Sequence, residues 1–233
     1  MCFSYSVHSN QQSLPFSSNN IIIPQPGFFF SGFQHPHLPI CTASENWEKA
    51  QWGLVPSWAS DIHAQQEIMS KTLNARIESI EEKPSFKSAW EQRPCIVASS
   101  GFFEWKHLNK QKIPHYIYNP DHPWLFFGGI YEDFKDKSSN TWLRSYSIIT
   151  TKANKLMSEI HNTKERMPLI LPPELLSTWL HSNASSRMKM KHSIPEEFLK
   201  AYPVSSALNS NRTDRNQSWA LKKEKPPENW TLF

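Results

Sequence analysis

The sequence predicts a single α+β domain, on three observations. Strand-like and helix-like runs are interspersed without the regular strand–helix alternation that builds a parallel α/β sheet. Neither an internal repeat nor a flexible linker divides the 233 residues, a length that suits one large domain or two small ones. The glycine-rich motifs G-x-x-x-x-G-K and G-x-G-x-x-G, which cradle nucleotide phosphates, do not occur. We therefore expect one folded domain over residues 1–208, followed by a polar and basic, loosely held tail over residues 209–233.

Strands are predicted wherever apolar residues alternate or run together over short stretches. The run W-L-F-F-G-G-I-Y at 124–131 is continuously apolar, so we expect that strand to be buried on both faces. The prolines near 28–30 indicate an edge or a turn there. The other predicted strands cover residues 2–8, 95–99, 114–118, 143–151 and 204–208.

Helices are predicted where apolar residues recur with a spacing of three or four. Leu156 and Ile160 share one face of a helix over 152–160. An early proline suits the start of a helix over 172–181. The remaining predicted helices cover 61–76 in part, 79–92 and 195–202, and the polar stretch 11–20 is a predicted loop.

Composition narrows the class of protein. The net charge of +4 is compatible with a polyanionic partner. The three cysteines are odd in number and form no C-x-x-C pair, which argues against a disulfide framework and a structural zinc site. Cys41 and Cys95 read as small core residues. The N-terminus lacks the pattern of a signal peptide, and the apolar runs are shorter than the ~18 residues of a membrane helix. We expect a cytoplasmic protein that uses no metal, cofactor or membrane partner.

One acidic residue, Glu104, stands among aromatic residues in the stretch R-P-C-I-V-A-S-S-G-F-F-E-W-K at 93–106. A carboxylate packed among aromatic rings is costly to ionise, so its pKa is expected to rise, and raised pKa values concentrate at reactive sites. The alternative is a strand-edge glutamate that faces water.

Cys2 would become the first residue if the initiating methionine were removed. A terminal cysteine carries an amine with a pKa near ~7.7–8.0 beside a thiol. With an aldehyde, this aminothiol forms an imine that the thiol closes to a five-membered thiazolidine ring. The alternative is that Cys2 has no chemical role.

Further candidates are polar or aromatic residues in short motifs. Asn74 in L-N-A-R could hold a hydroxyl or an amine, and Arg76 could grip a phosphate. The alternative is an asparagine at a helix end and an arginine on the surface. His161 could protonate a leaving hydroxyl. Nearby cations could favour a phosphate, and the tryptophans of W-G-L-V-P-S-W could stack on bases; these DNA-binding candidates are Lys152, Arg166, Trp52 and Trp58.

Five motifs in order resemble the SRAP family, the SOS-response-associated peptidases. They are M-C, W-G-L-V-P-S-W, L-N-A-R-I-E-S, R-P-C-I-V-A-S-S-G-F-F-E-W and T-T-K-A-N-K-L-M-S-E-I-H-N-T-K-E-R-M-P-L-I-L. The resemblance implies a compact domain with a barrel-like mixed β core and peripheral helices. It also implies binding to single-stranded DNA at abasic sites and a covalent thiazolidine through Cys2. Asn74, Glu104 and His161 match the family's other site residues, and Arg76 matches a phosphate contact. The family usually opens M-C-G-R, whereas this chain opens M-C-F-S.

The predicted function is therefore that of an enzyme-like sensor, which shields abasic sites during DNA repair by crosslinking to them. Autopeptidase, hydrolase and lyase activities accompany this prediction. One alternative is a cysteine peptidase that uses Cys2 with His161 and Glu104, acting on its own leading residues. Another is a non-covalent reader of damaged or modified bases. We expect a monomer, associated with the nucleoid if the protein is bacterial.

Overall fold

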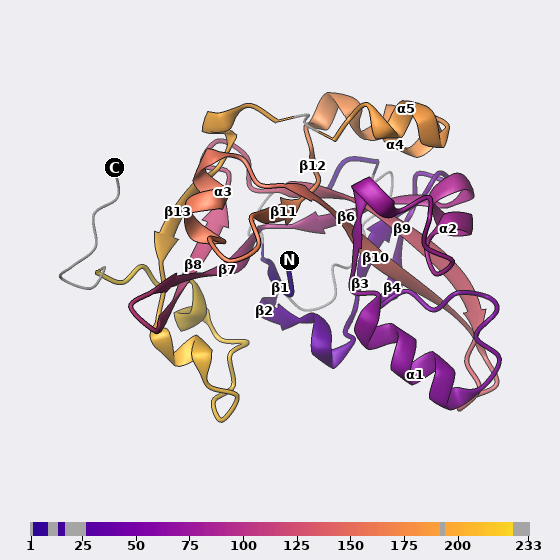
Figure 1. The fold of residues 1–233 in the computed structure, drawn as a ribbon, viewed down its shortest axis with the longest axis horizontal. Coiled ribbons are helices and arrows are strands. Elements are labelled where there is room, and N and C mark those ends of the chain that lie inside the picture. Colours follow the sequence, from indigo (N-terminus) through magenta and orange to yellow (C-terminus); the bar gives the residue numbers. More distant parts are fainter. Residues whose placement is uncertain (1, 9–13, 17–26, 192–193, 226–233) are drawn as a thin grey trace.

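The fold is centred on a closed ring of five β-strands (Figure 1). The computed structural model describes residues 2–8, 14–16, 27–191 and 194–225. Around the ring, each strand pairs with the next and the last pairs with the first: β10 (Trp142–Lys152), β4 (Trp47–Trp52), β3 (His37–Cys41), β6 (Pro94–Ser99) and β9 (Leu125–Lys135). The β4–β10 pairing is parallel and the other four are antiparallel. The predicted α+β class and barrel-like mixed core are confirmed.

Three short strands extend this ring. β5 (Asn74–Arg76) pairs in parallel with β10, β11 (Arg166–Pro168) pairs antiparallel with the end of β10, and β12 (Ile170–Leu171) pairs with β9. β10 is long enough to pair with four different strands along its length. It therefore connects the barrel with the short strand that carries Asn74.

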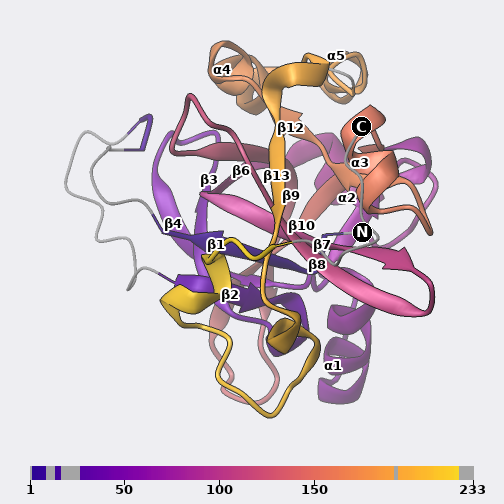
Figure 2. The same ribbon diagram turned by 90° about the vertical axis from the view of Figure 1, so that its left-hand side faces the viewer.

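A second, fully antiparallel sheet lies against one side of the barrel (Figure 2). Its strands, in spatial order, are β13 (Lys200–Pro203), β8 (Gln111–Tyr118), β7 (Gly101–Leu108), β1 (Ser4–Val7) and β2 (Gly27–Ser31). β1 pairs with β7 only at Gly101 and Phe102, so the rest of that edge of β7 is free of β1. The chain before β1 therefore approaches β7 next to Glu104.

Short helices lie around the periphery. Asp61 caps α1, since its carboxylate accepts from Ala64 N at 2.9 Å, and Asn154 caps α3 in the same way at Met157 N. The α-helices are α1 (Ile62–Lys71), α2 (Lys87–Gln92), α3 (Lys155–Ile160), α4 (Leu176–His181) and α5 (Ala184–Met188). Six 3₁₀ turns are described: η1 (Gly32–Gln34), η2 (Ile77–Ser79), η3 (Pro173–Leu175), η4 (Glu196–Phe198), η5 (Ser206–Asn209) and η6 (Ser218–Leu221). Among the described residues, no helix is long and apolar enough to cross a membrane.

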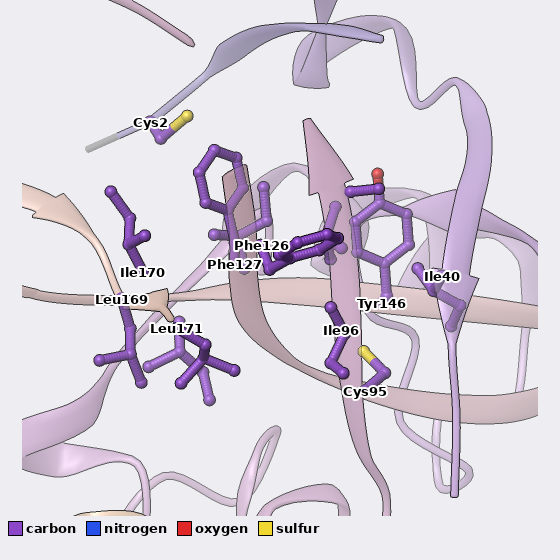
Figure 3. Close-up of a cluster of buried hydrophobic side chains, with 14 of the residues drawn as sticks. Cys2, Ile40, Cys95, Ile96, Phe126, Phe127, Tyr146, Leu169, Ile170 and Leu171 are labelled. Atoms are coloured by element: carbon purple, nitrogen blue, oxygen red, sulfur yellow. The ribbon is translucent and has the colours of Figure 1, made fainter. Parts of the chain in front are cut away.

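The main core fills the barrel and the space between the two sheets. Figure 3 shows part of this cluster, with Cys2 at its border and the β9 and β12 side chains beside it. Tyr5 and Tyr146 are fully buried, and their hydroxyl oxygens lie 2.7 Å apart. Cys41 and Cys95 are free and buried, as predicted for small core residues. A smaller cluster, which includes Phe29 and Phe103, lies on the other face of the second sheet.

Most predicted elements are present, but two near the C-terminus were wrong. Residues 195–202 were predicted as a helix and instead form η4 followed by β13, and residues 204–208 were predicted as a strand and contain η5. The free edge of β8 pairs with Lys200–Pro203, and these tertiary hydrogen bonds override the local helical spacing. The predicted helix over 61–76 ends at Lys71, and the last three residues form β5. Of the predicted loop 11–20, only residues 14–16 are among those described.

Residues 209–225, the described part of the predicted loose tail, pack against the second sheet. The Asn216 side chain accepts from the backbone N–H of Phe28 at 2.7 Å, and the Arg215 guanidinium lies over the Phe29 ring at 4.6 Å. Ala220 is fully buried in the smaller cluster. The expectation of a loose tail is therefore wrong for these residues, because the second sheet has an apolar outer face that needs cover. Residues 226–233 lie outside the described part of the chain.

Candidate functional site

Cys2 occupies a buried position immediately before β1. The Asn74 side-chain nitrogen donates to the Cys2 carbonyl oxygen at 2.9 Å, which ties the start of the chain to β5. Burial raises the pKa of the Cys2 thiol, and the negative charge of Glu104 raises it further. The thiol is therefore protonated at neutral pH, and Cys2 lies close enough to Glu104 to sense its charge. The expected removal of Met1 concerns a residue outside those described.

Glu104 lies on β7 and is 4% exposed. Along β7, side chains alternate between the faces of the sheet, so Phe102 and Glu104 share the face that meets the main core, while Phe103 faces the smaller cluster. Burial raises the pKa of Glu104 to about 7. The predicted rise in pKa is confirmed, and the alternative of a water-facing glutamate is wrong.

His161 ends α3 and brings an imidazole to Glu104. Its Nδ1 lies 2.8 Å from the Arg166 carbonyl oxygen and 3.8 Å from Oε1 of Glu104. A carbonyl can only accept, so Nδ1 carries the proton and Nε2 has the lone pair. Burial lowers the pKa of His161 to about 4. At neutral pH the His161–Glu104 contact therefore joins a neutral imidazole to a partly protonated carboxyl group, and is not an ion pair.

Two pockets flank these residues. One, of about 480 Å³, is lined by Glu104 and His161 together with Phe3, Trp105, His107, Lys112, Thr163, Lys164, Leu208, Asn209 and Arg215. The other, of about 620 Å³, includes Asn74 and lies between α1 and the start of α2. We call the first the Glu104 pocket and the second the Asn74 pocket. The Cys2 carbonyl accepts a hydrogen bond from Asn74 of the Asn74 pocket, and the charge of Glu104 in the Glu104 pocket raises the pKa of the Cys2 thiol.

Two of the predicted DNA-binding residues line the Asn74 pocket. Arg76 is exposed, and Trp58 is 56% exposed, so both side chains are accessible from solvent. Lys71 and Lys83 also line this pocket. It therefore combines an aromatic ring with cationic groups beside Asn74.

Three other predicted DNA-binding residues lie elsewhere. Trp52 is fully buried and donates its Nε1–H to the Leu73 carbonyl oxygen at 2.9 Å, so its ring is unavailable to a base. Arg166 is 6% exposed and forms two hydrogen bonds with Glu78, at 2.6 and 2.8 Å, so its guanidinium is already paired. Both predicted contacts are therefore wrong for this structure. Lys152 is exposed but lines a different pocket, with Asn154 and Met167.

The sequence reasoning missed several residues near the site. His115 of β8 is directly opposite Glu104 in the β7–β8 pairing and is buried, and burial lowers its pKa to about 4. The cationic residues of the Glu104 pocket were also missed: Lys112, Lys164 and Arg215. His115 lies in the predicted strand over 114–118, but β7 was not predicted, so the sequence offered no register that would pair His115 with Glu104. Only the folded tail reveals Arg215. Among the described residues, no group of three or more His, Cys, Asp or Glu side chains could hold a metal ion.

Solved structures share this two-sheet fold. A protein from Bacteroides thetaiotaomicron is similar with a TM-score of 0.80 and 34% identity, over 85% of this chain and 86% of that one. A protein from Bordetella bronchiseptica has a TM-score of 0.75 at 20% identity, over 88% of this chain and 100% of that one, which shows a common fold. The chain thus belongs to a class of proteins that share this fold of a five-stranded barrel and a second sheet.

Sequence relatives define the family. The Bacillus subtilis (strain 168) "Abasic site processing protein YoqW" is 36% identical over 170 residues, which cover 71% of this chain and 72% of the relative. The Xenopus tropicalis "Abasic site processing protein HMCES" is 30% identical over 192 residues, covering 73% of this chain and 56% of the relative. Residues 1–211 match the family described as "SOS response associated peptidase (SRAP)", and this chain belongs to that family.

Proposed function

We propose that this protein processes abasic sites in DNA by capturing the ring-opened sugar on Cys2. The observation that carries the proposal is the gathering of Cys2, Asn74, Glu104 and His161, which come from the segment before β1, from β5, from β7 and from the C-terminal end of α3. All four belong to one chain, so a single copy could act. The names of the relatives, which specify abasic site processing, support the same substrate.

The chemistry requires Cys2 to be the first residue, with a free amine. That amine has an ordinary pKa near ~7.7–8.0, so part of it is neutral at physiological pH. The thiol is protonated, because burial raises its pKa. Nitrogen is therefore the better first nucleophile, and sulfur acts second.

In the first step, the amine nitrogen attacks the aldehyde carbon of the open sugar. A C–N bond forms, the carbonyl electrons move to oxygen, and one proton must pass from nitrogen to oxygen. Neutral His161 suits this transfer, since its Nδ1–H is held by the Arg166 carbonyl and its Nε2 can accept a proton. Asn74 holds the backbone of Cys2 in place meanwhile.

In the second step, Glu104 in its acid form donates a proton to the hydroxyl, which leaves as water and gives a protonated imine. We therefore assign the acid role to Glu104, with a pKa of about 7, and not to His161, to which the sequence prediction gave it. The thiol then adds to the imine carbon, and its proton passes to the Glu104 carboxylate. The acid is restored, and the net change is the loss of one water.

We propose that the DNA strand on either side of the abasic sugar binds in the two pockets. In the Asn74 pocket, Trp58 could stack on a base and Arg76 could pair with a phosphate. In the Glu104 pocket, Lys112, Lys164 and Arg215 supply positive charge. A stacking ring needs an unpaired base, which favours single-stranded DNA as the substrate.

A peptidase activity is the second candidate, because the family description names one. Cys2 lies near an imidazole and a carboxyl group, the partners that activate cysteine nucleophiles. The raised pKa of the thiol works against a resting thiolate, so we propose that any such activity is confined to the chain's own leading residue. A non-covalent reader of damaged bases would bind DNA equally well without Cys2.

The test is a denaturing gel of protein incubated with single-stranded DNA that carries one abasic site. We expect a shifted band for the wild-type protein and none for Cys2→Ala, with Cys41→Ala as the control for a buried cysteine outside the site. A shifted band for Cys2→Ala would refute the proposal. Mass spectrometry of the purified protein would show whether the first residue is cysteine.

A further inference from the structure

A pair of phenylalanine rings, Phe3 and Phe33, lies beside the proposed nucleophile. Phe33 belongs to η1 and is 61% exposed, one of three large hydrophobic residues described as exposed. Phe3 follows Cys2 directly and is partly buried. The ring centroids are 5.0 Å apart with an interplanar angle of 37°. The pair therefore presents one aromatic ring to solvent with a second ring packed against it.

The backbone fixes the Phe3–Phe33 pair relative to Cys2. The Gly32 N–H donates to the Phe3 carbonyl oxygen at 2.9 Å, so η1 is attached to the residue after Cys2. Adjacent Cα atoms are ~3.8 Å apart, so Phe3 lies one residue step from the sugar captured on Cys2. A sugar held at Cys2 therefore places its neighbouring nucleotide within reach of the rings.

The pair is also linked to both pockets through its neighbours. Phe3 lines the Glu104 pocket together with Glu104 and His161. On the other side, a Cβ on Gly32 would lie 3.1 Å from the Leu73 side chain, next to Asn74 of the Asn74 pocket. A DNA strand that enters the Glu104 pocket therefore meets Phe3 in its lining, and the exposed Phe33 ring lies against Phe3.

We propose that Phe3 and Phe33 form a stacking platform for the nucleobase next to the abasic sugar. An abasic site has lost one base, so each neighbouring base has one face with no stacking partner. The Phe33 ring, supported from behind by Phe3, replaces the missing partner. Every base offers such a face, so the platform takes any base. The inference rests on the proposed DNA function and adds a contact to it.

This platform gives a reason why the chain opens with M-C-F-S instead of the family's usual M-C-G-R. The second and third residues after the methionine in the usual M-C-G-R are replaced here by Phe3 and Ser4, so an arginine that could contact a phosphate is missing. Ser4 is buried, whereas Phe3 contacts an exposed ring. In this chain, stacking on the Phe3–Phe33 pair contributes to DNA affinity, whereas in family members that open M-C-G-R the arginine contributes through its charge. The stacking contribution should depend little on salt.

The test measures equilibrium binding by fluorescence anisotropy, so it is independent of the covalent step. The DNA carries a tetrahydrofuran spacer at the lesion, which has no aldehyde. In two further DNAs, the 5′ or the 3′ neighbour is also a spacer. Phe33→Ala should weaken binding about 5- to 100-fold on the DNA with both neighbouring bases, and Phe33→Trp should retain it. On the DNA that lacks the stacked neighbour, Phe33→Ala and wild type should bind equally.

Trp142→Ala is the matched control, since Trp142 is 72% exposed at the start of β10 and lines neither pocket. It should bind all three DNAs as the wild type does. The platform is refuted if Phe33→Ala binds like the wild type, or if its loss of affinity is the same on all three DNAs. Failure of the wild type to crosslink to an abasic site would refute the proposed function alone, because the anisotropy comparison would still decide the platform.

Discussion

Replacement of Glu104 by glutamine tests the proton-donor assignment most directly. Glutamine has nearly the same shape and hydrogen-bonding reach but cannot donate a proton to the leaving hydroxyl. With a pKa of about 7, half of Glu104 is in the acid form at pH 7 and about a tenth at pH 8. General acid catalysis typically contributes 10²–10⁴-fold, so we expect Glu104→Gln to lower the crosslinking rate by about that factor.

The pH dependence distinguishes this role from simple damage to the site. The wild-type rate should rise as the amine loses its proton, near pH ~7.7–8.0, and fall about tenfold per unit as Glu104 ionises. These two limbs give a narrow bell with its maximum near pH 7 to 8. Glu104→Gln should retain the rising limb and lose the falling one, so that its slow rate reaches a plateau at alkaline pH.

The assay is single-turnover crosslinking to abasic single-stranded DNA between pH 5.5 and 9, resolved on denaturing gels. Glu132→Gln serves as the control, because Glu132 is also buried with a raised pKa but pairs with Arg93 at 3.1 Å on the barrel strand β9. It should lower stability and leave the pH profile unchanged. If Glu104→Gln still shows the falling limb, another group is the acid and the assignment is wrong.

Stability gives a second readout of the same substitution. The folded-state pKa of Glu104 is above its ordinary value of 4.5, so the folded state binds more protons than the unfolded state between pH 4.5 and about 7. This contribution to the free energy of unfolding is fully present below pH 4.5 and is lost as the pH rises through 7. The total loss is about 3 kcal/mol as an upper bound. Glu104→Gln should therefore be more stable than wild type above pH 7 in urea unfolding.

Three further predictions concern the two tryptophans and the arginine. Trp58→Ala should weaken binding to single-stranded DNA by about 1–3 kcal/mol in anisotropy titrations, and Arg76→Ala should reduce the salt dependence by about one phosphate contact; unchanged affinities would remove the Asn74 pocket from the DNA path. Trp52→Ala should lower the free energy of unfolding by about 3–5 kcal/mol, since Trp52 is fully buried. A Trp52 variant of normal stability and reduced DNA affinity would contradict this assignment to the core.

The contrast between the two tryptophans shows where sequence reasoning ends. Both belong to the motif W-G-L-V-P-S-W, and their type alone suggests base stacking for either. Trp52 ends β4 inside the ring and bonds to Leu73, whereas Trp58 lies in the turn beyond it and faces a pocket. Only the closure of the barrel, a pairing between strands far apart in sequence, decides between them.

Glu104 shows the opposite case. Its aromatic neighbours predicted a raised pKa, because a carboxylate packed among rings is costly to ionise, although the strand that carries it, β7, was not predicted. The contact with His161 depends on where α3 ends relative to β7. Such distances between elements could not come from spacing in the sequence. The family resemblance brought Cys2, Asn74, Glu104 and His161 together without giving their geometry.

The segment after residue 208 has a practical consequence. The Asn209 side chain accepts a hydrogen bond from Trp105 at 2.7 Å, and Arg215 lines the Glu104 pocket. Residues 209–225 therefore form part of the wall of that pocket. A chain cut after Leu208 would retain every proposed catalytic side chain yet uncover Phe29 and open one wall to solvent. Easier access of water would let Glu104 ionise at lower pH. Truncation at the apparent end of the domain would therefore change reactivity without touching a reactive residue.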